Sequence, residues 1–328
     1  MRIVNSISNV IAYKIIPELL IVGSNGFHPN NQNYNYFILS ESDVCKVKVL
    51  KKYVFLQFEE FGKIIVLTEK GKFLKTIKEG FNLYSSIKTN NRLIIRNRIT
   101  KSYWFIFEDL QFEESTLSFR FNYYINNLFF FKIYNTLEKV SPQPSWLIDF
   151  SEFGIHKNFN DEIIPNDLDG DLMGFEDSLY VPLQGGQLLC LDVNTGEKKW
   201  IQEYNGRSGF YSLNNDKIYK HDGLSLFEID AKMGLALRSK MFSESDEAEL
   251  QKFYALNGFW TYEDVIILYG LDNTVVMLNK NNFSLLGFIS LPAPISTDKN
   301  NVIWDKNKLY VLDLNNTLHI FEKEKLPH

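Results

Sequence analysis

The chain has 328 residues and a formal net charge of -5, with 45% hydrophobic and 15% aromatic residues. This content is ample for one large β-rich domain over residues 1–328, and no apolar run approaches the roughly 18 residues of a membrane span. The N-terminus has no uninterrupted apolar segment and no small-residue cleavage site. We therefore expect a cytoplasmic protein without a membrane contact, unless a signal peptide has been removed.

Pairs of short apolar runs recur along the chain, and each pair reads as two neighbouring strands. Seven pairs are found: Tyr53–Leu56 with Ile64–Leu67, Leu93–Ile95 with Tyr103–Phe107, Leu128–Phe131 with Trp146–Ile148, Leu179–Val181 with Leu188–Leu191, Lys217–Tyr219 with Leu226–Asp230, Val265–Leu268 with Val275–Leu278, and Leu309–Leu312 with Leu318–Phe321. Seven repeats give about 47 residues each, a length typical of propeller repeats. The runs are continuous, which indicates strands covered on both faces.

The fourth pair carries the clearest repeat. An apolar run at Leu179–Val181 is followed by a second run ending in Asp192, and then by the segment Asn194–Trp200 with the sequence NTGEKKW. The pattern resembles the repeat of the quinoprotein-like (PQQ-repeat) β-propellers. In the next repeat, Gly234 follows Asp230 at the same offset, whereas Arg238 stands where the clear copy has Trp200.

The resemblance and the spacing together predict an all-β fold, a seven-bladed β-propeller. Residues 41–328 would form the repeats, and strands within residues 1–40 would close the ring. The last pair lacks an outer strand, which Leu19–Val22 or Tyr36–Leu39 could supply; closure would remove exposed sheet edges. Two alternatives stay open, an eighth N-terminal blade and a β-sandwich or pair of smaller β domains.

The resemblance implies pyrroloquinoline quinone and calcium only for the true dehydrogenases of the family, which have regular blades with tryptophans and often adjacent cysteines. This chain has one regular copy and two separate cysteines, Cys45 and Cys190. The acidic turn Asp167–Asp171 lacks the glycine and carboxylate offsets of an EF-hand loop. The sequence therefore predicts a non-catalytic member with no cofactor, no metal and no disulfide. The resemblance implies that Trp200 packs between blades.

Long connections are expected on one face of the fold, at Tyr134–Ser145, Lys157–Met173 and Ser243–Lys252. Two of them concentrate negative charge, and the carboxylates are Asp161, Glu162, Asp167, Asp169, Asp171, Glu176, Asp177, Glu244, Asp246, Glu247 and Glu249. Such a field would repel nucleic acid and favour a basic partner. The alternative is that these are ordinary solvated loops.

These features favour a monomeric, non-enzymatic propeller that binds a basic protein, either an immunity-type inhibitor of a basic toxin or an assembly scaffold. The alternative is an enzyme or a small-molecule or carbohydrate-binding protein that uses the axial funnel. Long acidic loops would attract the partner, and aromatic and arginine side chains would anchor it. The predicted partner-binding residues are Trp146, Asp167, Asp169, Asp171, Tyr204, Arg207, Phe210, Glu244, Asp246 and Glu247.

Overall fold

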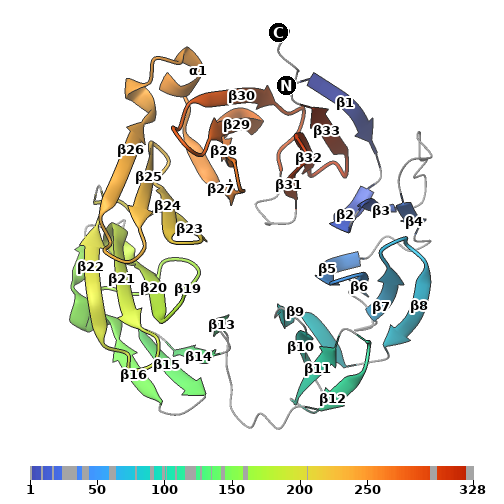
Figure 1. Ribbon diagram of the computed structural model, residues 1–328, viewed down its shortest axis with the longest axis horizontal. Coiled ribbons are helices and arrows are strands. Elements are labelled where there is room, and N and C mark those ends of the chain that lie inside the picture. The colour runs from blue at the N-terminus through green and yellow to red at the C-terminus, as the bar shows by residue number, and fades with distance from the viewer. Residues whose placement is uncertain are drawn as a thin grey trace. The chain divides into compact units, whose positions relative to one another are not determined.

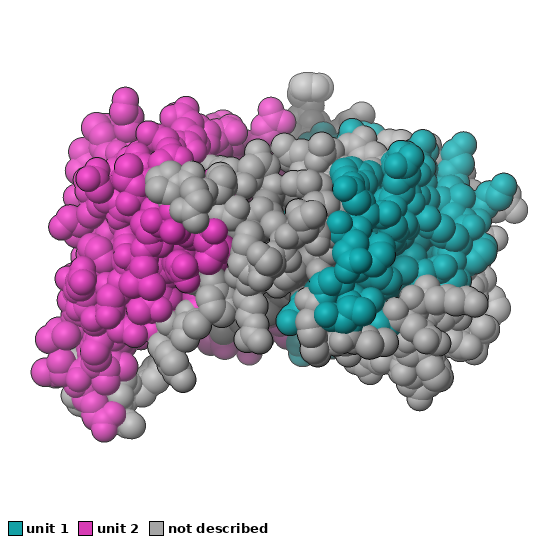
Figure 2. Space-filling model, turned by 90° about the horizontal axis from the view of Figure 1, so that it is seen from below, with its two compact units in different colours: residues 1–118, 293–328 teal, residues 119–292 magenta. Residues whose placement is uncertain are grey.

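The fold is taken from a computed structural model of the chain. It describes residues 2–8, 10–16, 18–23, 35–38, 44–58, 64–77, 80–88, 92–97, 100, 102–107, 109–114, 123–125, 128–133, 135–141, 145–157, 162–204, 206–295 and 301–322. Within these residues the strands form nine sheets, of which seven have four strands, one has three and one has two. The chain divides into two compact units, residues 119–292 (unit 2) and residues 1–118 with 293–328 (unit 1; Figure 2).

Unit 2 contains four antiparallel sheets whose strands neighbour one another in chain order, as the ribbon shows from β19 to β22 and from β23 to β26 (Figure 1). The first two sheets are β13 (Tyr123–Ile125), β14 (Leu128–Ile133), β15 (Thr136–Ser141) and β16 (Trp146–Asp149), and β19 (Met173–Phe175), β20 (Ser178–Leu183), β21 (Gln187–Asp192) and β22 (Lys198–Glu203). The other two are β23 (Phe210–Asn214), β24 (Lys217–His221), β25 (Ser225–Asp230) and β26 (Ala236–Met241), and β27 (Ala255–Thr261), β28 (Val265–Gly270), β29 (Thr274–Asn279) and β30 (Leu285–Ser290).

Short elements join these sheets. The two-stranded hairpin consists of β17 (Ile155–Lys157) and β18 (Ile163–Pro165), and the helical turns are η1 (Phe150–Phe153), η2 (Gln184–Gly186), η3 (Phe242–Glu244), η4 (Leu271–Asn273) and α1 (Ala248–Gln251). Below, the strands of each four-stranded sheet are called a to d in chain order.

Unit 1 contains the remaining sheets. Two have chain order, namely β5 (Val44–Leu50), β6 (Tyr53–Phe58), β7 (Ile64–Thr68) and β8 (Phe73–Ile77), and β9 (Phe81–Lys88), β10 (Arg92–Asn97), β11 (Tyr103–Phe107) and β12 (Phe112–Glu114). A three-stranded sheet holds β2 (Val10–Ile16), β3 (Glu18–Gly23) and β4 (Asn35–Ile38), and the last sheet holds β31 (Val302–Asp305), β32 (Lys308–Leu312), β33 (Leu318–Glu322) and β1 (Arg2–Ile7).

Six of the seven predicted strand pairs are confirmed as the two middle strands of a four-stranded sheet, from β6 with β7 to β32 with β33. The third pair is wrong, because β15 lies between β14 and β16 and pairs with both. The run Thr136–Ser141 has the sequence TLEKVS, whose two apolar residues, Leu137 and Val140, form neither a continuous apolar run nor a strict alternation, so the sequence indicates a loop there. The predicted long connection Tyr134–Ser145 therefore contains a strand of six residues.

Closure from the N-terminal side is confirmed, but the predicted strands do not provide it. β1 pairs with β33 in antiparallel register and becomes the outer strand of the last sheet. Leu19–Val22 and the described part of Tyr36–Leu39 belong instead to the three-stranded sheet. Ile7 is 3% exposed and packs with Leu318 and Ile320 in one core cluster, so burial of apolar surface fixes the pairing. The number of blades stays a prediction.

Backbone hydrogen bonds sort the connections of unit 2 into two sets at opposite ends of the strands. On the loop face, which carries the d-to-a connections and b-to-c turns, Gln184 N donates to Asp167 O and Phe242 N donates to Leu224 O, both at 2.9 Å. On the turn face, which carries the a-to-b and c-to-d turns, Val193 N donates to Asp177 O at 2.9 Å. Glu176 and Asp177 therefore lie on the turn face, not with the acidic loops as expected.

Neighbouring sheets of unit 2 are joined by a repeated contact, which we call the outer-strand lock. Trp200 on β22 lies against the c-to-d turn of the next sheet, where its Nε1 donates to Lys232 O at 3.0 Å. Trp146 on β16 does the same one sheet earlier, where Nε1 donates to Val193 O at 3.2 Å. The expected inter-blade role of Trp200 is thus confirmed as packing between consecutive sheets.

A third lock uses arginine at the position equivalent to Trp200. The Arg238 guanidinium lies 4.0 Å from the centre of the Phe283 ring and donates to the carbonyls of Lys280 and Asn281. Phe283 occupies the turn position of Gly196 and Gly234, since all three backbone N–H groups donate to the residue four positions earlier. A glycine in the turn leaves room for a tryptophan ring to pack on its backbone. A phenylalanine at the same position fills this room with its own ring, on which a guanidinium packs.

We expect the two isoleucines of β1 to differ strongly in their effect on stability. Ile7→Ala removes a side chain that is 3% exposed and should lower the free energy of unfolding by about 2–4 kcal/mol. Ile3→Ala is the matched control, because Ile3 is 55% exposed, and it should stay within about 0.5 kcal/mol of the wild type. Denaturant unfolding measures both. Equal losses would contradict the pairing of β1 with the last sheet.

The lock makes a second prediction at Gly234, whose φ is +71°. A Cβ there would lie 2.7 Å from the Trp200 ring, so Gly234→Ala should cost about 1–3 kcal/mol more than Gly206→Ala. Gly206 is the control, because it has φ of +59° and its Cβ would meet only the flexible Glu203 carboxylate at 3.2 Å. When Trp200 is also replaced by alanine, Gly234→Ala and Gly206→Ala should lower the melting temperature equally. An excess that persists would rule out the ring contact.

Candidate functional site

The loop face of unit 2 is organised around a glycine turn in η2. Gly185 and Gly186 have φ of +79° and +84°, in the left-handed region that glycine adopts at least cost. A Cβ on Gly186 would lie 2.3 Å from Arg207 O, so only glycine allows the segment after β22 to lie on this turn. Tyr204 N donates to Gly186 O across the contact.

A buried lysine binds the backbone of the same segment, the one that follows β22. Lys220 is fully buried, and its Nζ donates to Tyr204 O at 2.5 Å and to Arg207 O at 2.7 Å. The Nζ also lies 5.8 Å from the ring centres of Tyr204 and Tyr211. Burial lowers the pKa of Lys220 to about 8, although nearby carboxylates oppose this shift. The ammonium therefore fixes the backbone that presents Arg207, whose own side chain is exposed.

Phe210 is the exposed aromatic side chain beside this segment. It is 47% exposed, and its ring stacks on the His221 imidazole with ring centres 5.1 Å apart and planes inclined by 22°. His221 is fully buried, and its ring also meets that of Phe259, with ring centres 4.9 Å apart and planes inclined by 75°. Burial lowers the pKa of His221 to about 3, so the imidazole is neutral. Neither of its ring nitrogens has a partner among the described residues.

The acidic turn Asp167–Asp171 lies on the loop face, as predicted, and its carboxylates differ in exposure. Asp167 is partly buried and forms an ion pair with Lys132 at 3.0 Å. Asp169 is fixed through its backbone, since its N–H donates to Pro182 O at 2.8 Å, and its charge acts on Lys220 and Tyr211. Asp171 is exposed. Asp169 and Asp171 therefore contribute most of the field that an approaching molecule would meet.

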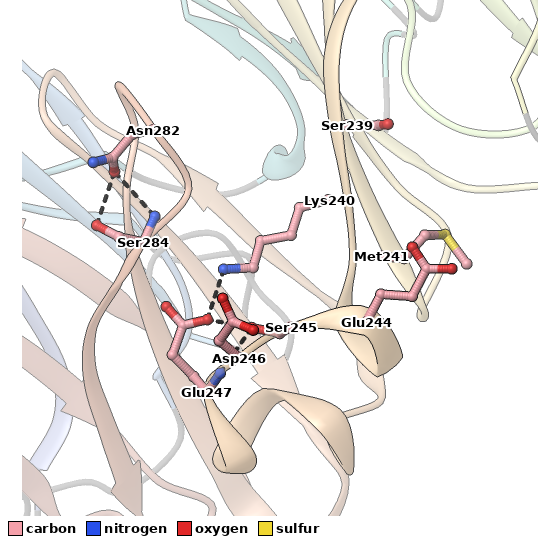
Figure 3. Close-up of a pocket in the computed structure, with 9 residues that line it drawn as sticks. All are labelled: Ser239, Lys240, Met241, Glu244, Ser245, Asp246, Glu247, Asn282 and Ser284. Atoms are coloured by element: carbon pink, nitrogen blue, oxygen red, sulfur yellow. Dashed lines mark hydrogen bonds and ion pairs between the residues drawn. The ribbon is translucent and has the colours of Figure 1, made fainter.

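The second acidic segment lines a polar cavity of about 390 Å³ (Figure 3). Glu247 is bound within the protein: its carboxylate accepts from Lys240 Nζ at 2.9 Å, from Leu285 N at 3.2 Å and from Ser245 Oγ. These hydrogen bonds lower the pKa of Glu247 to about 2. Glu244 and Asp246, in contrast, are exposed. Of the three carboxylates, only these two are available to a ligand or partner.

Two of the predicted anchors are used inside the fold. Trp146 lies at the turn-face end of its sheet, where its ring packs on Gly196, and not with the acidic loops as expected. Tyr204 is 6% exposed and its hydroxyl donates to Gly234 O, so it is part of the contact between two sheets. The structure therefore brings together Asp167, Asp169, Arg207 and Phe210 on one part of the loop face.

Sequence reasoning missed the residues that hold this arrangement, namely Gly186, Lys220 and His221. A signal existed for the last two, because a lysine and a histidine stand in the sequence KIYKH, where β24 continues from an apolar run. Buried ionisable groups are expensive, so their presence in a central strand marks a place where they hold neighbouring backbone or rings.

The described residues include few groups that could bind a metal ion or react covalently. Among the described residues, no group of three or more His, Cys, Asp or Glu side chains is placed to bind a metal ion. Cys190 is free and buried, and burial raises the pKa of its thiol to about 11, which leaves it an unreactive thiol. The side chain of Cys45 lies outside the described residues. Among the described helices, none has the length and apolar character to cross a membrane.

Comparison with known proteins identifies the fold. No family model and no curated protein matches the sequence. BamB from Moraxella catarrhalis superimposes with a TM-score of 0.53 at 11% identity, covering 100% of this chain and 99% of BamB. The C-terminal WD40 domain of Sif2 gives 0.56 at 12% identity, covering 100% and 98%. The β-propeller domain of Myceliophteria thermophila Cps50 (Swd1) gives 0.53 at 11% identity, covering 86% and 97%. The chain is an all-β propeller.

The lowered pKa of Lys220 predicts a pH-dependent stability. Between pH 8 and pH 10.5 the unfolded chain keeps the proton that the buried ammonium has lost, so the stability contributed by this group rises with pH over that range. Lys220→Met removes the titration. The difference in unfolding free energy between wild type and variant should therefore shift in favour of the wild type by about 1–3 kcal/mol from pH 7.5 to pH 10.

Denaturant unfolding of both proteins at the two pH values measures this difference and cancels the titration of the tyrosines, which is common to both. A difference independent of pH would show that Lys220 is not a desolvated ammonium.

Proposed function

We propose that this chain is a non-catalytic β-propeller that binds another protein through the loop face of unit 2. The observation that carries the proposal is Phe210, a half-exposed ring held on the buried imidazole of His221, with the Arg207 segment and the Asp169 carboxylate beside it. Aromatic and arginine side chains on rigid supports are the groups that dominate binding energy in protein interfaces.

The charge of the face defines the kind of partner. Asp169 and Asp171 come from one connection, and Glu244 and Asp246 from another on the same face. Complementary charges mainly accelerate association and increase specificity, whereas buried aromatic anchors slow dissociation. We therefore propose a partner with a basic surface, which the acidic connections attract and which Phe210 and Arg207 retain.

The likeness to a WD40 domain and to BamB supports the propeller scaffold, and a propeller that carries long connections on one face suits a protein-binding role. Neither the described residues nor the three structures compared above favour the narrower role of a toxin inhibitor, so the proposal is for a general protein-binding scaffold. The cavity beside Lys240 is a poor place for acid–base catalysis, because Glu247, with a pKa of about 2, is a weak proton acceptor and is already bound by its neighbours.

The test uses the partner captured by the tagged chain from its native host. Asp167→Asn, Asp169→Asn and Asp171→Asn together should slow association about threefold to tenfold at low salt, with a smaller effect as salt increases, because screening removes the attraction. The matched control removes three exposed carboxylates from the turn face, by Glu176→Gln, Asp216→Asn and Glu263→Gln, and should leave the association rate unchanged. Surface plasmon resonance measures both rates.

Phe210→Ala tests the anchor separately. It should speed dissociation about tenfold or more while the association rate stays within about twofold, as expected for an anchoring side chain. A thermal melt controls for loss of the His221 stack. Capture of an acidic partner, or equal effects of the loop-face and turn-face variants, would contradict the proposal.

A further inference from the structure

The outermost strand of the third sheet of unit 2, β26, has an unusual edge. It ends the sheet order β23-β24-β25-β26, and no described strand pairs with its outer side. Sheet edges are normally protected by charged side chains that discourage another strand from adding. The cations of β26 are used elsewhere: Arg238 binds Glu228 and the Phe283 turn, and Lys240 binds Glu247 and Phe283 O.

Three exposed positions at the start of this edge are apolar. Met233, Leu235 and Leu237, which we call the β26 stripe, are 53%, 52% and 50% exposed. They follow one another at every second residue through the c-to-d turn and into β26. Leu237 lies on β26, Leu235 immediately precedes the strand and Met233 lies in the turn before Gly234, so the stripe gathers three exposed apolar side chains at the start of the strand.

The chain contains its own comparison. The turns that begin at Asp192 and Asp230 are equivalent, because Gly196 N and Gly234 N each donate to the Asp carbonyl four residues earlier at 2.8 Å. In this register, Thr195, Glu197 and Lys199 of the preceding sheet correspond to Met233, Leu235 and Leu237. The next sheet places Asn282 and Ser284 at the first two of these positions. The same fold therefore accepts polar residues here, and apolar ones at β26 are not required for folding.

Acidic groups lie at the other end of the same strand. The cavity in Figure 3 is lined by Ser239, Lys240 and Met241 of β26, and by Glu244, Asp246 and Glu247. Its one ammonium, Lys240, is neutralised by Glu247. Glu244 and Asp246 have no basic partner among the described residues. The C-terminal end of β26 therefore lies beside a cavity that can hold a side chain, and this cavity carries more negative than positive charge.

We propose that β26 is a docking edge for an extended segment of a partner protein. The segment adds a strand to the sheet, lays apolar side chains on the β26 stripe and places a lysine or arginine at the cavity beside Glu244 and Asp246. At about 3.3 Å per residue, Leu237 and Lys240 are about 10 Å apart along the strand, so the basic residue stands about three to five positions from the apolar ones.

Charge selects this occupant over a second copy of the chain. Each copy has a formal net charge of -5, and the cations of its own β26 are already paired within the protein. A separate segment with a free basic residue meets both features of the edge. The β26 stripe is separate from the residues around Phe210, although Glu244 and Asp246 also belong to the acidic loop face. The inference therefore goes beyond the function proposed above, and variants of the stripe and of Asp167, Asp169 and Asp171 test the two separately.

The probe is an array of peptides of about ten residues that alternate valine and threonine and carry Lys, Arg, Gln or Glu near either end. The full chain should bind the Lys and Arg peptides, and the Glu peptides should bind at least about tenfold more weakly, because like charges would meet at the cavity. N-methylation of alternate backbone nitrogens should abolish binding, since it blocks strand pairing.

Variants locate the binding. Met233→Thr, Leu235→Glu and Leu237→Lys together install the residues of the preceding sheet, and should weaken binding of the Lys peptide at least about tenfold while the melting temperature stays within about 2 °C. Glu244→Gln with Asp246→Asn should remove the preference for Lys over Gln. Leu147→Lys is the control, because Leu147 is 63% exposed on another outer strand, and it should change nothing.

Light scattering gives the oligomeric state of the free chain. The proposal expects a monomer at the concentrations used. A dimer that the triple variant dissociates would show that a second copy occupies the edge and would overturn it. Equal binding of Lys and Glu peptides, or binding that survives N-methylation or the triple variant, would also overturn it. The Asp167, Asp169 and Asp171 variant should leave peptide binding unchanged, which separates this result from a failure of the loop face.

Discussion

The outer-strand lock is the interaction on which unit 2 depends. A flat side chain on the last strand of one sheet lies against the c-to-d turn of the next and donates hydrogen bonds to its carbonyls, as Trp146, Trp200 and Arg238 do in succession. The residue in the turn and the flat side chain that packs on it differ together from one sheet to the next. Glycine leaves room for an indole, whereas Phe283 fills the room and offers a ring to the guanidinium. Each sheet therefore positions the next one, and the connections of the loop face extend from these consecutive sheets.

Two buried polar side chains of unit 2 support residues of the loop face. Lys220 and His221 are neighbours on β24, and both are fully buried. One holds the Arg207 segment through two carbonyls, and the other supports the exposed ring of Phe210. Burying an ammonium and an imidazole opposes folding, so they are best understood through the surface they support. Rigid presentation reduces the entropy that an interface loses on binding.

The sequence was sufficient for the middle strands and for the fold class, because a continuous apolar run between turn residues has few other readings. It was insufficient where apolar content was low. Thr136–Ser141 has only two apolar residues, Leu137 and Val140, and no strand period, so its sequence indicates a loop. Arg2–Ile7 carries three polar residues, and the more apolar segments after it are stronger strand candidates. Asp167, Asp169, Arg207 and Phe210 were placed on the loop face correctly. Trp146 was not placed correctly, and Tyr204 is buried there instead of exposed, because the hydrogen bonds of both side chains to another sheet depend on contacts distant in sequence.

Hydrogen–deuterium exchange of the free chain and of its complex shows whether a partner docks on the loop face of unit 2. We expect slower exchange on binding in residues 162–172 and 206–213, with no change in the turns at 193–196 and 280–284. Protection confined to those turns, or absent from the segment that contains Phe210, would contradict the account.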